Sequence, residues 1–140
     1  MGTDVKINHK RELIYLACPY SDPSATVRLQ RFQQATKAAA ALIRRGYFVF
    51  SPITMTHPID LVLAVDGETL GSDFWVRFDE AFMQLCSRIS VVTLPGWQKS
   101  SGVAREIAYF AARGVVPEYL RPHDFGVSET EPLFAAAFVT

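Results

Sequence analysis

An aspartate on the apolar side of a predicted helix is the first residue that suggests chemistry. The helix is expected over residues 73–87, and a projection at about 100° per residue gives it a broad apolar arc. The members of the arc are Trp75, Val76, Phe78, Phe82, Met83, Leu85 and Cys86. Asp79 falls inside this arc, whereas the other polar residues lie on the opposite side. A carboxylate on an apolar face is costly unless it is paired, protonated or used. Asp79 is therefore either a reactive acid or a structural aspartate that is bonded to Tyr, Arg or a backbone amide.

A glutamate near the start of a second predicted helix has a related setting. The residues three or four positions from Glu106 are all uncharged: Gly102, Val103, Tyr109 and Phe110. The helix opens at KSSG, where Ser100 or Ser101 can cap it. Its free amides and positive dipole end favour an anion such as phosphate, and they also favour the ionised form of Glu106. An ionised, partly desolvated carboxylate suits a nucleophile that attacks a sugar carbon. A capping carboxylate is the structural alternative.

The remaining candidates indicate less specific roles. Cys18 lies in no C-x5-R phosphate loop, because Ser24 occupies the arginine position, so we expect a buried free thiol. His9, His57 and His123 have no metal-ligand spacing with the two cysteines, which predicts no metal site. Neither G-x-G-x-x-G nor G-x-x-x-x-G-K-[ST] occurs, and no cofactor is expected. Four side chains could stack on a base or serve as ordinary core or loop aromatics: Tyr15, Tyr20, His57 and Trp97.

Alternating strands and helices must position these side chains. Short apolar runs predict strands at residues 12–18, 47–50 and 89–94, and a short fourth strand that opens at 115–116. Helical periodicity predicts helices at 25–45, 73–87 and 101–113. Residues 53–72 show little clear period, so we expect a long loop there, with room for a short helix around 59–65.

This order of elements predicts an α/β fold. The architecture expected is a small flavodoxin-like or Rossmann-like parallel sheet, of strand order about 2-1-3-4, sandwiched by helices. Ligands of such sheets bind at the carboxyl ends of the strands, near the point where the strand order reverses. Three loops should meet there, at residues 18–24, 51–57 and 95–102.

Length and charge restrict the partners. The 140 residues suit a single domain over 1–140, with a core at about 12–120, a polar N-terminal arm at 1–11 and a C-terminal tail at 121–140. The 14 basic residues balance the 14 acidic ones, so a small molecule is a better partner than a nucleic acid polymer. No apolar run approaches the roughly 20 residues that a membrane helix needs, so no membrane partner is expected. The polar first residues and the two cysteines predict a cytoplasmic protein.

Four segments together form a recognisable pattern. They are IYLACPYS at 14–21, SPI at 51–53, Asp79, and PGW at 95–97 followed by Ser100, Gly102 and Glu106. With them the chain resembles the nucleoside 2-deoxyribosyltransferase family, most closely its short branch with a Y-L-A-x-P-Y start and a G-W-x-x-S-x-G-x-x-x-E segment. The similarity covers residues 13 to about 117.

The resemblance implies roles for particular residues. Glu106 matches the nucleophile that attacks the anomeric carbon and holds the sugar covalently. Asp79 matches the acid that positions the sugar or handles the proton of the leaving base, and Tyr15 matches the residue that orients the nucleophile. Ser100 and Gly102 match positions that bind the 5′ end of the substrate. The full substrate-binding set that we expect is Ser100, Gly102, Ser101, Tyr20, Pro19, Ser51, His57 and Trp97.

The expected function is cleavage or transfer at the N-glycosidic bond of a nucleoside or nucleoside 5′-monophosphate, through a glycosyl-Glu106 intermediate. The choice between transferase and hydrolase, the base and the sugar stay open. One alternative is a non-catalytic module that binds a nucleotide or nucleotide-sugar, and another is an assembly subunit. Relatives form homo-oligomers, and the apolar run LFAAAFV at 133–139 needs cover, so we also expect a homo-oligomer.

Overall fold

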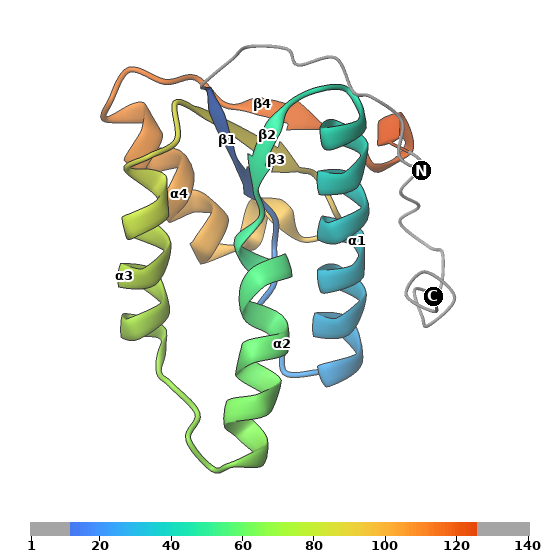
Figure 1. Cartoon of the computed structure of the whole chain (residues 1–140), viewed down its shortest axis with the longest axis vertical. Helices are drawn as coiled ribbons and strands as arrows, with labels where there is room; N and C mark the ends of the chain where they lie inside the picture. Colours follow the sequence, from blue (N-terminus) through green and yellow to red (C-terminus); the bar gives the residue numbers. More distant parts are fainter. Residues whose placement is uncertain (1–11, 126–140) are drawn as a thin grey trace.

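A four-stranded parallel sheet forms the centre of the computed structural model, which describes residues 12–125 (Figure 1). Its strands are β1 (Leu13–Ala17), β2 (Phe48–Phe50), β3 (Arg88–Val92) and β4 (Glu118–Leu120). The strand order is β2-β1-β3-β4, and every pairing is parallel. The predicted fold class and strand order are therefore confirmed.

The alternation of side chains along β1 divides the core into two halves. Leu16 and Cys18 pack on one face with α1 (Ala25–Arg44). Tyr15 and Ala17 pack on the other face, which α3 (Ser72–Met83) and α4 (Ser101–Ala111) cover (Figure 1). Because successive residues of a strand point to opposite faces, the register of β1 commits Tyr15 to the α4 side.

Two serine caps fix where the helices that flank the carboxyl edge begin. Ser24 Oγ accepts a hydrogen bond from the Val27 amide at 3.3 Å and starts α1. Ser100 Oγ accepts one from the Val103 amide at 3.2 Å and starts α4. Ahead of Ser100, Trp97–Lys99 form the short helix η1, and Gly96 before it has a φ of +89°. The predicted capping role of Ser100 is confirmed.

The loop predicted over residues 53–72 is wrong in its first part, whereas the short helix expected around 59–65 is present as the end of a longer helix. Residues Pro52–Val65 form a 14-residue helix, α2, which runs beside α1. Pro52 stands at its first position, where a missing amide proton costs nothing. Pro58 lies inside the helix, and the buried side chains are only Pro52, Ile53 and His57. A helix with so few buried positions carries no strong apolar period, so the sequence pattern does not indicate its full length.

The fourth strand and the end of α3 also differ from the prediction. β4 lies at Glu118–Leu120 rather than opening at 115–116, followed by the short helix η2 (Pro122–Phe125). Helix α3 ends at Met83, so Leu85 lies beyond it and is 67% exposed instead of belonging to an apolar arc. No helix within residues 12–125 is long and apolar enough to cross a membrane. The arm at 1–11 and the apolar run at 133–139 lie outside the described residues.

Pro58 should limit the stability of α2. A proline inside a helix removes one backbone hydrogen bond and is about 3 kcal/mol less favourable than alanine, although it also restricts the unfolded chain by up to about 1 kcal/mol. We therefore expect Pro58→Ala to raise the free energy of unfolding in urea by about 1–2 kcal/mol. Val62→Ala, at a position of α2 that is 62% exposed, is the control and should change it by less than about 0.7 kcal/mol. An unchanged or lower stability of Pro58→Ala would contradict this account of the helix.

Candidate active site

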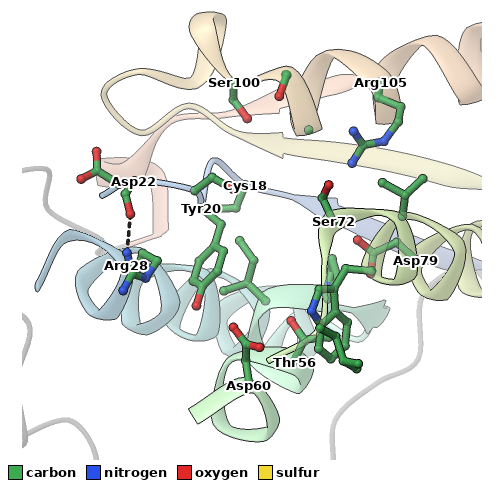
Figure 2. A pocket seen from close by; sticks show the side chains of 18 of the residues that line it. Cys18, Tyr20, Asp22, Arg28, Thr56, Asp60, Ser72, Asp79, Ser100 and Arg105 are labelled. Carbon is green, nitrogen blue, oxygen red and sulfur yellow. Dashed lines mark hydrogen bonds between the residues drawn. The ribbon is translucent and has the colours of Figure 1, made fainter. Parts of the chain in front are cut away.

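A cavity of about 730 Å³ opens at the carboxyl edge of the sheet (Figure 2). Its size lies in the range of about 300–1,000 Å³ that is typical of small-ligand sites. The segment after β1, the first turns of α2 and the start of α4 all contribute to it, as the strand-end rule predicts. Helix α3 adds a fourth wall, which contains Trp75, Val76 and Asp79.

A buried hydrogen bond joins the central strand to α4 beside this cavity. The Tyr15 hydroxyl donates to Glu106 Oε2 at 2.7 Å, across 91 positions of sequence. Tyr15 is fully buried, and its ring lies 6.0 Å from the rings of both Phe50 and Phe110. The contact that the resemblance implied between Tyr15 and Glu106 is therefore present. Neither residue is among those that line the cavity, and Glu106 is 7% exposed.

Burial dominates the protonation of Glu106. It raises the pKa of this carboxyl to about 8, although the hydrogen bond from Tyr15 and the charge of Arg105 act in the opposite direction. The negative charge of Asp79 raises the pKa of Glu106 further. The sequence had suggested that the helix dipole favours the ionised form. Glu106 lies beyond the first turn of α4, where the dipole effect has fallen off, so burial outweighs it.

Asp79 combines access to the cavity with a desolvated carboxyl group. Burial raises its pKa to about 6, and Arg105 opposes this shift. Its Oδ1 atom is buried and has no hydrogen-bond partner among the described residues. The position on the apolar side of α3 predicted such an environment. At neutral pH Asp79 can therefore exchange a proton with a group in the cavity, as an acid near its pKa does.

The start of α4 presents polar groups to the same cavity. Lys99, Ser100, Ser101 and Gly102 all line it. A Cβ atom on Gly102 would meet its nearest neighbours, Arg105 Nη2 and Ser100 Oγ, at 3.7 and 3.8 Å, which is ordinary contact. The fold therefore does not require glycine at this position, whereas close approach of a ligand to the backbone would favour it.

The other predicted substrate-binding residues differ in how they relate to the cavity. Tyr20 lines the cavity. His57 is buried and does not line the cavity, but its Nδ1 atom lies 2.6 Å from the Tyr20 hydroxyl oxygen. Pro19 and Ser51 are buried outside the lining, and the Ser51 hydroxyl pairs with Thr54. Trp97 lies apart from the cavity, with its ring 5.3 Å from that of Tyr119.

Several lining residues did not emerge from the sequence. Arg28 on α1 and Arg105 on α4 bring positive charge to the cavity, and Thr56 and Asp60 on α2 bring polar groups (Figure 2). Arg105 directly precedes Glu106 in the sequence, and a basic residue next to a candidate carboxylate is a signal that could indicate it. Thr56 and Asp60 belong to the segment 53–72, for which the sequence predicts mainly a loop, so the pattern does not place them at the cavity.

The lining carries charged groups of both signs. Within residues 12–125 no cluster of three or more His, Cys, Asp or Glu side chains could hold a metal ion. Cys18 lines the cavity as a free, buried thiol, and burial raises its pKa. The groups in and beside the cavity include two carboxyls with raised pKa values, Asp79 and Glu106, and the phenol of Tyr15.

Glu106 should destabilise the fold as it ionises. Because its pKa is raised from 4.5 to about 8, the folded state holds a proton that the unfolded state releases, and stability falls as the pH rises through this range. We expect Glu106→Gln to be more stable than the parent by over about 1 kcal/mol above pH 8, with no such gain at pH 4. Urea unfolding at several pH values measures this. Glu68→Gln, at an exposed position, is the control. A gain that does not depend on pH would exclude Glu106 ionisation as its source.

The comparisons with known proteins are consistent with one family for this chain. The model of a domain of unknown function, DUF1937, matches residues 12–119, which include β1, β2, β3, most of β4 and the cavity-lining residues. No curated protein matches the chain. Since the matched residues make up well over half of the sequence, the chain belongs to the DUF1937 family.

Proposed function

We propose that this protein cleaves or transfers the N-glycosidic bond of a nucleoside or nucleoside 5′-monophosphate, as the resemblance to nucleoside 2-deoxyribosyltransferases implies. The observation that carries the proposal is the buried Tyr15–Glu106 hydrogen bond at 2.7 Å, coupled electrostatically to Asp79 on the cavity wall. A carboxyl oriented by a phenol and a second carboxyl with a pKa of about 6 supply the nucleophile and the acid that a two-step displacement requires.

In the first step a Glu106 oxygen attacks C1′ of the sugar and the bond from C1′ to the base nitrogen breaks. The electron pair of that bond stays on the base, which takes a proton from Asp79. In the second step water or a second base attacks C1′ and releases the Glu106 carboxylate. The proton of the attacking group then passes to Asp79. Tyr15 keeps the carboxylate oriented by donating to Oε2.

A 5′-phosphate would suit the start of α4. Two hydroxyls, the Gly102 backbone and Lys99 lie on this side of the cavity, and the positive end of the helix dipole favours an anion there. This supports nucleoside 5′-monophosphates as substrates.

A homo-oligomer is also part of the proposal. The arm formed by α2 and α3 exposes large apolar side chains, including Leu61, Val62, Val65 and Phe74. An exposed apolar patch of this kind is typical of a surface that is covered in an assembly.

One observation favours a second candidate, a non-catalytic nucleotide-binding module. Glu106 is outside the cavity lining, and its pKa of about 8 leaves it largely protonated at neutral pH. A nucleophile must reach the substrate in its ionised form. The two candidates differ in a simple way, because only the enzyme releases a base.

The first test is chromatography of the purified protein with deoxyribonucleosides, ribonucleosides and their 5′-monophosphates, with and without a free acceptor base. We expect base release or exchange, lowered by at least about a thousandfold in Glu106→Gln. The control Glu68→Gln should keep full activity. Intact-protein mass spectrometry should detect a glycosyl adduct in the parent and none in Glu106→Gln. Nucleotide binding without turnover across the whole panel would favour the binding module instead.

The pH profile tests the roles of the two carboxyls. Glu106 must be ionised and Asp79 protonated, so kcat/KM should rise up to about pH 6, stay level to about pH 8 and fall above it. The Asp79→Asn variant lacks the acid whose deprotonation causes the alkaline fall. Its much lower kcat/KM should therefore keep rising to about pH 8 and then stay constant. An alkaline fall that persists in Asp79→Asn would assign the acid to another residue.

A further inference from the structure

The side of the cavity opposite α4 carries polar groups that the proposed chemistry does not use. We name Tyr20, Thr56 and Asp60 the α2 wall. In Figure 2 these three side chains lie across the cavity from Ser100 and Arg105 of α4. In a displacement the leaving base departs on the side away from the nucleophile. A base that leaves a sugar attacked from the α4 side would therefore face the α2 wall.

Asp60 offers an acceptor that the protein leaves unused. It lines the cavity, and its Oδ1 atom is buried without a hydrogen-bond partner within the described part of the chain. A desolvated carboxylate oxygen without a donor is unfavourable, so a ligand that donates N–H groups here would bind with advantage. The negative charge of Asp60 also reaches Tyr20 and His57, which places the three groups close together.

The Tyr20 hydroxyl can donate a hydrogen bond to a ligand, and its contact with His57 determines whether its proton is available. The His57 ring stacks on Phe32 at 4.4 Å, and its Nδ1 lies 2.6 Å from the Tyr20 hydroxyl oxygen. Burial lowers the pKa of His57, so the ring is neutral and carries one proton. Its Nε2 is buried without a partner, and an orphaned N–H is rarer in proteins than an orphaned acceptor. We therefore assign the proton to Nδ1, which donates to Tyr20 and leaves the Tyr20 hydroxyl proton free for a ligand.

We propose that the α2 wall selects guanine as the leaving base, with the Tyr20 hydroxyl donating to O6 and the Asp60 carboxylate accepting from N1–H and the 2-amino group. This inference rests on the proposed function for its substrate class. Adenine presents an amino group to the Tyr20 proton and an unprotonated N1 to the carboxylate, so both contacts become unfavourable. Cytosine likewise presents an amino group and an unprotonated ring nitrogen to these two side chains. Hypoxanthine keeps O6 and N1–H but lacks the 2-amino group, so it loses one contact with Asp60.

The test measures binding separately from chemistry. Calorimetry with the Glu106→Gln protein compares the 5′-monophosphates of deoxyguanosine, deoxyinosine and deoxyadenosine. We expect deoxyguanosine monophosphate to bind about tenfold tighter than the inosine nucleotide and about a hundredfold tighter than the adenosine nucleotide. This comparison needs no substitution in the α2 wall, so it does not depend on the folding of a variant there.

Variants of the wall then assign the preference to its residues. An asparagine at position 60 offers one acceptor and one donor, which match N6 and N1 of adenine. Asp60→Asn should therefore reduce the preference for guanine over adenine at least about tenfold, and Tyr20→Phe should reduce it by a similar factor. Asp66→Asn, at the exposed end of α2, is the matched control and should leave the preference unchanged.

The possible outcomes separate this inference from the proposed function. Base release by the parent protein without a guanine preference, or a preference that Asp60→Asn leaves intact, overturns the inference and keeps the function. A guanine preference that disappears in Asp60→Asn, in a parent protein that releases no base, supports recognition of guanine by the α2 wall and overturns the catalytic function.

Discussion

The hydrogen bond between Tyr15 and Glu106 is the constraint on which the candidate site depends. It exists because the pleat of β1 turns Tyr15 toward α4 and because the cap at Ser100 sets where α4 begins. The rings of Phe50 and Phe110 pack near the phenol, each with its centroid 6.0 Å away. A one-residue shift in the register of β1 would turn Tyr15 to the opposite face and leave Glu106 buried without its donor. The packing of the core and the orientation of the carboxyl are therefore one structural requirement.

The same burial sets how protons are distributed over the two carboxyls. With pKa values of about 6 and about 8, Asp79 and Glu106 hold one proton between them over much of the neutral range. That proton resides mainly on Glu106, whereas a nucleophilic attack needs it on Asp79. Arg105 lowers the pKa of both groups and lines the cavity. Under the proposed mechanism, a ligand that orders Arg105 near Glu106, or that accepts a hydrogen bond from protonated Asp79, would move the proton in the productive direction.

The sequence predicted the sheet side of the site better than the α2 side, and packing explains why. Asp79 stood out because α3 has a strong apolar arc, and Glu106 stood out because its helical neighbours are uncharged. Tyr15 required the resemblance, since a buried tyrosine in a strand has no distinctive local pattern. Asp60 could not be found because α2 buries only three side chains and contains Pro58, so local periodicity did not indicate a helix. The helical state of α2 depends on Pro52 at its first position and on tertiary contacts with α1.

This difference in packing separates two tasks within the cavity. The groups proposed for chemistry are fixed by the sheet and by α4, where Tyr15 is fully buried and Glu106 nearly so. The groups proposed for recognition of the base belong to the segment after β1 and to α2, a helix with few buried contacts and an interior proline. Elements with little burial open at low free-energy cost and accept substitutions readily. A change of base specificity would therefore need substitutions only in the α2 wall, while the Tyr15–Glu106 pair, which the core holds in place, could stay unchanged.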